Sequence, residues 1–169
     1  DVASSIGQSV PLVSASNTIT VTITVDHLLP SGSTVEITGL TGTQTVDGTL
    51  TVTSSPADVF TSNEGTWAKS TGTLTLTVAS GGLSAGTTYT VSFEVQNGNS
   101  AQGNARTVVI SGTVEVGTHD SAIGDHTLTS DTGDLMGVTG GAGPLLLAVG
   151  TFVDKDIGQS FPFVGGSNT

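Results

Sequence analysis

Residues 17–25 read Asn-Thr-Ile-Thr-Val-Thr-Ile-Thr-Val, a strict alternation of polar and β-branched apolar side chains. Successive side chains of an extended strand point to opposite faces, so Ile19, Val21 and Ile23 would share one face while the threonines occupy the other. β-branched side chains also favour the extended backbone. This stretch therefore predicts a strand that has one face on a core and the other face in water.

The same alternation recurs in five further segments, residues 34–38, 49–53, 73–79, 88–95 and 106–116. Turn-forming sequences separate them, such as Pro-Ser-Gly at 30–32 and Asn-Gly-Asn at 97–99. Short strands at this spacing predict an all-β fold, an antiparallel β-sandwich whose body we place at residues 1–116. We expect its core to contain Ile19, Val21, Ile23, Leu74, Leu76, Val91 and Phe93.

The end of the chain repeats its beginning. Residues 157–169 align with residues 6–18 at an offset of 151, and extending the alignment back to Val2 and Val153 gives ten identities in seventeen positions. Self-similarity at a fixed period indicates an array of one structural unit. We therefore expect a tandem repeat unit of about 151 residues, with residues 154–169 as the start of the next unit.

The repeated Ile-Gly-Gln-Ser element is our candidate for the joint between units, because it stands at both ends of the period. It is either the first strand of its own sandwich or an edge strand that completes a neighbouring one. In the second case its apolar residues would be buried against a neighbour. The residues that we assign to this joint are Ile6, Pro11, Ile157, Phe161, Pro162 and Phe163.

Two segments depart from the alternation. Residues 117–143 are rich in Gly, Asp and Thr and have no apolar row, so we expect a long loop or excursion there. Residues 144–153 contain the longest apolar run, Leu145 to Val149, which predicts a final buried strand.

Several phrases of the sequence resemble a known module: Ile6-Gly7-Gln8-Ser9, Asn17-Thr18-Ile19-Thr20, Pro30-Ser31-Gly32, Gly65-Thr66-Trp67 and Ser84-Ala85-Gly86-Thr87. In this order they are similar to a tandem module of very large, extracellular or cell-surface proteins of microalgae and related protists. The resemblance covers most of residues 6–116 and again 144–169. It implies an immunoglobulin-like β-sandwich in an extracellular array, and it brings no active site.

Composition narrows the classes of function. The chain has 30 Thr, 20 Ser and 24 Gly, only 10% charged residues, no Cys and a net charge of -11. Nucleic-acid binding needs clustered Lys and Arg, so we expect no such partner. No apolar run approaches the roughly 18 residues of a membrane span. We expect the 14 acidic residues to keep the surface soluble. The Thr rows follow from β-propensity, with O-linked glycans as the alternative explanation.

Few residues offer chemistry. The acids Asp120, Asp125, Asp131 and Asp134 lie in a Gly-rich segment that could wrap Ca²⁺, although simple Asx turns explain them as well. The three histidines lack the spacing of metal ligands, and no Gly-x-Ser-x-Gly elbow is present. Trp67 is either a core anchor or part of a sugar-binding platform. We expect no catalysis and no cofactor other than this possible Ca²⁺.

These observations predict a structural module of an extracellular fibre, filament or stalk, whose units are joined head to tail. The partners would be neighbouring copies of the same repeat. The alternative is an adhesin-like binding module that grips a glycan or a partner protein with residues 117–143, with Ca²⁺ as the candidate ion that stiffens it.

Overall fold

The computed structural model describes residues 4–118, 120–153, 156–158 and 164–165. Within these ranges the regular structure consists of ten strands, which confirms the all-β prediction. The strands are β1 Ser4–Gln8, β2 Ser16–Thr24, β3 Thr34–Thr38, β4 Gly48–Ser55, β5 Phe60–Ala68, β6 Thr73–Val78, β7 Thr88–Gln96, β8 Val109–Val114, β9 Ser121–Thr127 and β10 Thr129–Ser130.

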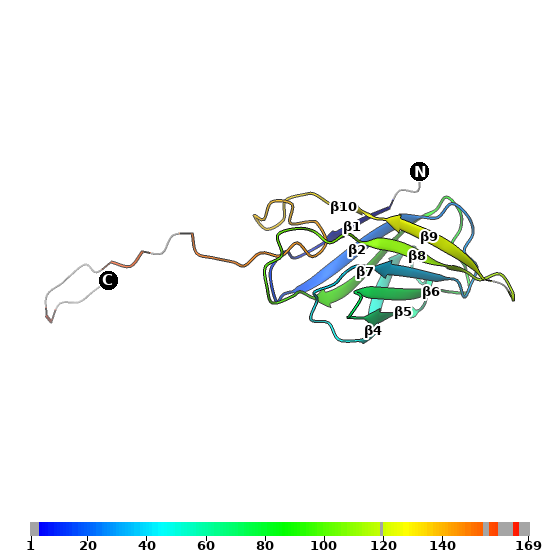
Figure 1. Ribbon diagram of the computed structural model, residues 1–169, viewed down its shortest axis with the longest axis horizontal. Coiled ribbons are helices and arrows are strands. Elements are labelled where there is room, and N and C mark those ends of the chain that lie inside the picture. The colour runs from blue at the N-terminus through cyan, green and yellow to red at the C-terminus, as the bar shows by residue number, and fades with distance from the viewer. Residues whose placement is uncertain (1–3, 119, 154–155, 159–163, 166–169) are drawn as a thin grey trace.

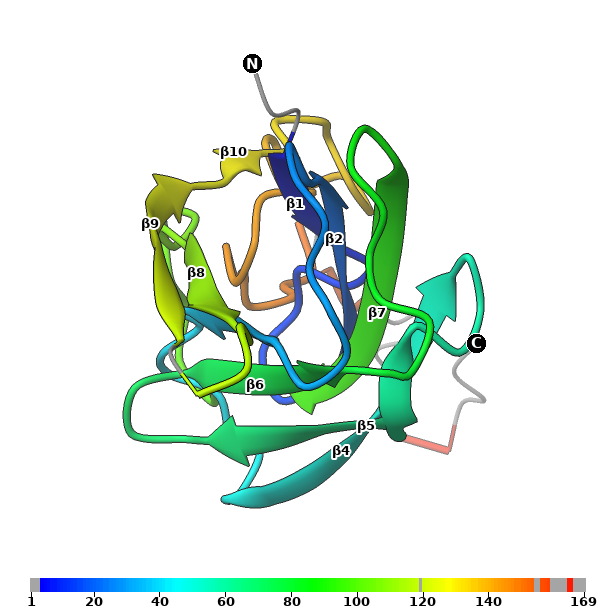
Figure 2. The same ribbon diagram turned by 90° about the vertical axis from the view of Figure 1, so that its right-hand side faces the viewer.

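The strands form one continuous sheet in the order β10-β1-β2-β7-β4-β5-β6-β3-β8-β9. Each neighbouring pair is antiparallel except β1 and β10, which run parallel. Strand β4 belongs to both halves, because residues 48–51 pair with β5 and residues 52–55 pair with β7. The sheet therefore curls around a single core instead of splitting into two separate layers (Figure 2).

The two ends of this sheet are joined by one residue. Strand β9 pairs with β8 at one end of the sheet and β10 pairs with β1 at the other, and only Leu128 separates β9 from β10. The chain thus steps across the opening, and the sheet becomes a nearly closed barrel (Figure 1).

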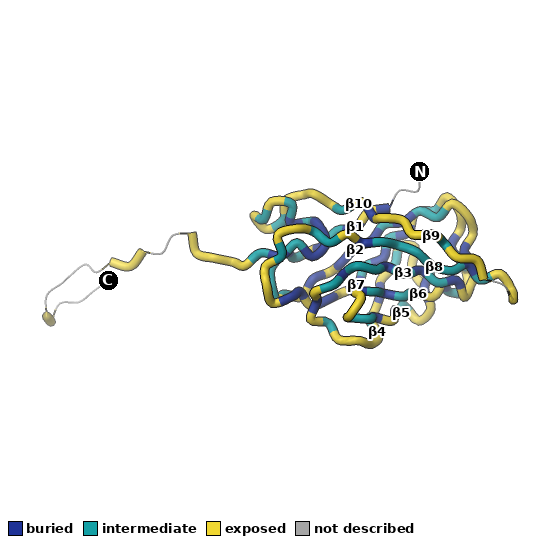
Figure 3. Tube along the Cα trace, in the orientation of Figure 1, coloured by how far each residue is buried: buried dark blue, intermediate teal, exposed yellow. Residues whose placement is uncertain are grey.

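The expectation of a loop over residues 117–143 is therefore wrong for β9 and β10. Strand β9 carries no row of apolar residues because it is exposed along nearly its whole length, on both faces (Figure 3). Without a buried face, a strand has no reason to alternate in sequence. A strand of this kind shows no alternation of polar and apolar residues by which the sequence could reveal it.

The core follows the predicted alternation. All seven predicted core residues, Ile19, Val21, Ile23, Leu74, Leu76, Val91 and Phe93, are at most 4% exposed. In the ladder between β2 and β7, Ile19 lies opposite Phe93 and Val21 lies opposite Val91, whereas Leu74 and Leu76 belong to β6. Leu128 and Leu145 join the same core, so the packed unit extends beyond residue 116.

Trp67 is a core anchor. Its ring is 1% exposed and lies 6.5 Å from the ring of Phe93. Its indole Nε1 donates to the carbonyl of Thr45 at 3.2 Å, which satisfies the polar end of a buried aromatic side chain. The indole face is therefore not a surface platform for a sugar.

The predicted final strand at residues 144–153 is also wrong. Residue Leu145 has a φ of 54°, in the left-handed region, which interrupts an extended chain. Only two isolated bridges follow, Gln102 with Leu147 and Leu12 with Ala148. The apolar run reflects burial of Leu145 and Leu147 in the unit, at 1% and 4% exposure, instead of a strand.

Candidate functional site

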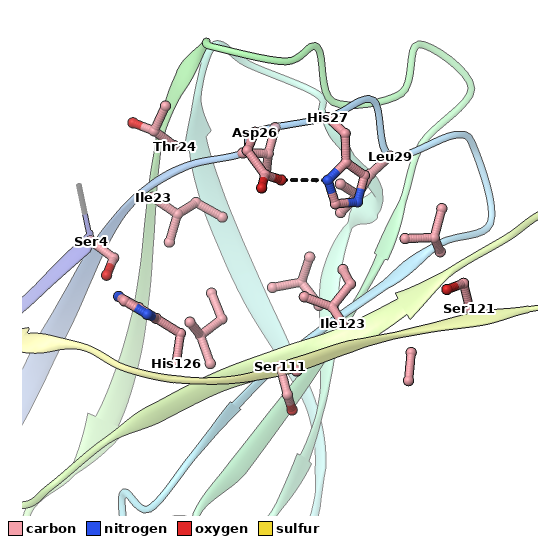
Figure 4. A pocket seen from close by; sticks show the side chains of 16 residues that line it. Ser4, Ile23, Thr24, Asp26, His27, Leu29, Ser111, Ser121, Ile123 and His126 are labelled. Atoms are coloured by element: carbon pink, nitrogen blue, oxygen red, sulfur yellow. Dashed lines mark hydrogen bonds and ion pairs between the residues drawn. The ribbon is translucent and has the colours of Figure 1, made fainter. Parts of the chain in front are cut away.

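A groove opens between the end of β2 and the β8–β9 hairpin. It encloses about 520 Å³ and draws its lining from β1, β2, β3, β8, β9 and the turn after β2. Its apolar lining includes Val35, Ile110 and Val114. Ile23, Leu29 and Ile123 belong to the same lining (Figure 4). Binding sites for other molecules are often apolar hollows of this size.

Polar groups stand at the edges of this groove. On one side the His27 Nδ1 pairs with the carboxylate of Asp26, in the turn that follows β2. On the other side His126 of β9 lies beside Ser4, the first described residue of β1 (Figure 4). The Ser4 hydroxyl is buried and has no hydrogen-bond partner among the described residues. The groove thus combines an apolar floor with an incompletely satisfied polar rim.

His27 and His126 are exposed, whereas His119 lies outside the described residues. The sequence offered no signal for the groove itself. The apolar residues of its lining have the sequence pattern of ordinary core residues. The groove itself depends on the separation of β9 from β1 and β2, which no local pattern shows.

A second feature is a buried network of three amide side chains, Gln8, Asn17 and Asn97. The Asn17 Nδ2 donates to Gln8 Oε1 and to Asn97 Oδ1, both at 2.8 Å. The Asn17 Oδ1 accepts from the backbone amides of Ser9 and Val10, at 3.1 and 3.0 Å. Pairing of this kind is what makes buried amides tolerable in a core.

The same network ties the start of the unit to its end. The Gln8 Nε2 donates to the carbonyls of Gly141 and Leu146 at 2.8 and 2.9 Å, and Gln8 Oε1 accepts from Leu145 N at 2.8 Å. Gly7 lies against the same segment, since a Cβ there would stand 3.4 Å from the carbonyl oxygen of Ala142. Strand β1 is therefore docked on residues 141–146.

The residues predicted to form the joint between units divide into two sets. Ile6 is 2% exposed and Pro11 is buried, and the Pro11 carbonyl accepts from Ala148 N at 2.8 Å. Both lie inside their own unit. In the second copy, Ile157 is 95% exposed, whereas Phe161, Pro162 and Phe163 lie outside the described residues. In its first copy the repeated element is thus the first strand of its own unit.

The four acids considered for Ca²⁺ are spread along β9 and the segments on either side of it, and all are exposed. Asp131 Oδ1 accepts from Gly133 N, and Asp134 Oδ1 accepts from Gly140 N, both at 2.9 Å. The part of the chain that the structure describes contains no group of three or more His, Cys, Asp or Glu side chains arranged to hold a metal. Calcium binding by Asp120, Asp125, Asp131 and Asp134 stays a prediction.

Comparison with known proteins gives little. No family model matches the chain, and no curated protein matches it. Among solved structures it is similar to the collagen-binding domain from a Staphylococcus aureus adhesin, at 11% identity and a TM-score of 0.39, over 76% of this chain and 96% of that domain. In the described residues, no helix is both long enough and apolar enough to cross a bilayer.

Proposed function

We propose that this chain is a non-catalytic structural module of an extracellular fibre, filament or stalk, built of units in tandem. The observation that carries the proposal is which residues the repeat preserves. Ile157, Gly158, Gln159 and Asn168 stand 151 positions after Ile6, Gly7, Gln8 and Asn17. In the first copy these residues make contacts within one unit, to its core and to its residues 141–146. Their repetition indicates a second unit that uses the same contacts.

The position of the two ends suits a module under tension. The described chain begins at Ser4 in β1, and its tail follows Ala148, which is bridged to Leu12. In Figure 1 the N-terminus lies above the upper side of the barrel, and the tail leaves the barrel on the left. Its first and last segments lie side by side and parallel, through the bridge of Leu12 with Ala148 and the bonds of Gln8 to residues 141–146. Pulling the two ends apart would load these hydrogen bonds together, in shear, so that they resist as a group instead of opening one by one.

Two further parts of the proposal follow the family resemblance. The resemblance implies an immunoglobulin-like module, with which this nearly closed barrel shares mostly antiparallel strands around one core. The Thr-rich outer rows suit a surface that faces water and carries O-linked glycans. The outer row of β2, Thr18 to Thr24, lies beside the row Thr88 to Glu94 of β7. We place the protein outside the cell, with neighbouring copies of its own repeat as its partners.

A two-unit chain tests this proposal. Residues 19–153 would be repeated after Thr169, so that residues 157–169 can act as the first strand of the second unit. We expect two folded units, with the side-chain amide protons of Gln159 and Asn168 protected from exchange like those of Gln8 and Asn17. The variant Asn168→Ala should lower the stability of the second unit and leave that of the first unchanged. A second unit that folds equally well without Gln159 and Asn168 would contradict the proposal.

An adhesin-like binding module is the second candidate, favoured by the groove. Part of its lining, residues 121–124 and His126, comes from the segment that we expected to grip a partner. Screening glycans and matrix proteins against the chain, with the backbone amides of Ala122, Ile123 and Gly124 as reporters, tests this function. Shifts confined to these residues on addition of one ligand class would support it.

A further inference from the structure

We propose that the groove of each unit receives the linker of the preceding unit, with Val153 and Phe152 as the side chains that enter it. This inference rests on the proposed tandem array and specifies how its units touch. It assigns the groove to a neighbouring copy of this chain and not to an external ligand.

The register of the repeat brings the linker to the groove. With the offset of 151, Lys155 takes the position of Ser4, which lines the groove, and Val153 takes the position of Val2. Two residues of extended chain span at most about 7 Å. Val153 of one unit therefore cannot lie far from the groove of the next.

The linker side chains have no cover in their own unit. Val149, Phe152 and Val153 are 55%, 82% and 102% exposed. They follow Ala148, the last residue bridged to the barrel, on the tail that extends away from it (Figure 1). Adjacent exposed apolar side chains are common where a chain meets a partner.

The groove matches such an occupant in chemistry. Its floor of aliphatic side chains accepts apolar groups, and its volume of about 520 Å³ has room for more than one side chain. Strand β9 stands last in the sheet and pairs with β8 alone within the described residues. An extended linker could therefore also pair with the free edge of β9, as peptides do when they add a strand to a sheet.

The sequence contains the end of the linker twice, as residues 1–2 and as residues 152–153, and comparing the two copies shows which side chain they share. Valine stands at both equivalent positions, Val2 and Val153, whereas Phe152 corresponds to Asp1. We therefore assign the shared contact to the valine, with Phe152 adding apolar surface at the joint that follows this unit.

Titration of the chain with itself tests the inference. An isotope-labelled chain that carries Val2→Ser, Phe152→Ser and Val153→Ser, so that neither its own first residues nor its own tail can compete, is mixed with unlabelled native chain up to about 1 mM, the effective concentration that a short linker provides. We expect chemical-shift changes at the backbone amides of Ala122, Ile123 and Gly124. Unlabelled chain that carries Phe152→Ser and Val153→Ser should cause no chemical-shift changes at these amides.

A matched pair of variants locates the contact. Gly124 lines the groove, and a Cβ at this residue would meet nothing within 4 Å, so a labelled chain with Gly124→Glu should fold and lose the shifts. Gly103 has the same freedom outside the groove, so Gly103→Glu should retain them.

Absence of shifts at about 1 mM would overturn the inference, because the linker of an array would then leave the groove empty. Shifts at other strands, or equal shifts with the serine titrant, would also overturn it. Neither result affects the two-unit test of the array, which depends on Gln159 and Asn168 and not on the groove.

Discussion

At the scale of single residues, Asn97 shows how this protein uses buried polar groups. Its side chain is 0% exposed, yet its Nδ2 donates to the carbonyls of Val10 and Leu12 at 2.8 Å each. Its Oδ1 accepts from Asn17, also at 2.8 Å. One amide therefore holds the turn after β1 against the end of β7.

We expect Asn97→Ala to lower the free energy of unfolding by about 2 kcal/mol, because two part-buried carbonyls lose a donor and the buried Asn17 amide loses one of its two acceptors. Urea unfolding measures this change. Asn99→Ala is the matched control, since Asn99 is exposed and its side chain accepts only from Ser100 Oγ, at 3.4 Å. Equal losses in the two variants would show that the network does not stabilise the unit.

Gly112 is a second residue whose role depends on its neighbours. A Cβ at this position of β8 would lie 2.1 Å from the carbonyl oxygen of Thr34, in the adjacent strand β3. We expect Gly112→Ala to destabilise the protein by about 2 kcal/mol or more, because the two strands must separate to admit the methyl group. Thermal unfolding of Gly124→Ala provides the control, and an equally small effect of both substitutions would contradict this reading.

At the scale of elements, the step from β9 to β10 decides how the sheet ends. Leu128 lies between two exposed strands and is itself 4% exposed, packed in the common core. Its backbone amide donates to the Val108 carbonyl at 2.9 Å. This one apolar residue anchors an otherwise polar crossing.

We therefore expect Leu128→Ala to cost about 2 to 4 kcal/mol, within the range for truncating a buried leucine. Hydrogen exchange should become faster in β9 and β10 before it changes in β2 and β7. Thr127→Ala, at an exposed neighbouring position, should change stability by less than about 0.5 kcal/mol. If hydrogen exchange became faster by the same factor in all strands, β9 and β10 would not open separately from the rest of the barrel.

At the scale of the whole molecule, one core connects nearly all strands. It extends from Ile6 in β1 to Leu145 near the end of the unit, and the predicted central residues of β2, β6 and β7 lie within it. Because nearly all strands contribute to the same core, we expect the unit to unfold in one cooperative step.

Val91→Asp tests this dependence. Val91 is 1% exposed, and an unpaired carboxylate there costs several kcal/mol, comparable to the roughly 5 to 15 kcal/mol stability of a domain. We expect the variant to be unfolded by circular dichroism. Thr90→Asp, on the outer face of the same strand, should remain folded, and a folded Val91→Asp protein would show that β7 is not central to the core.

The sequence by itself determined which residues are buried in most of the strands, because the two-residue period is a local property of an extended backbone. It also revealed the repeat, although the role of Gln8 and Asn17 became clear only from their partners. The acids at 131 and 134 fit the alternative role in local turns, since each accepts a hydrogen bond from a glycine amide a few residues away.

Only the tertiary structure decided the order of the strands, the closure of the barrel and the groove. Strand β9 has almost no buried face and so leaves no periodic trace, and Leu145 interrupts an apolar run that locally looks like a strand. The bonds of Gln8 connect residues 133 and 138 positions apart, and the groove exists because β9 ends the sheet beside Ser4. Such features depend on which distant segments meet, and a local pattern carries no information about that choice.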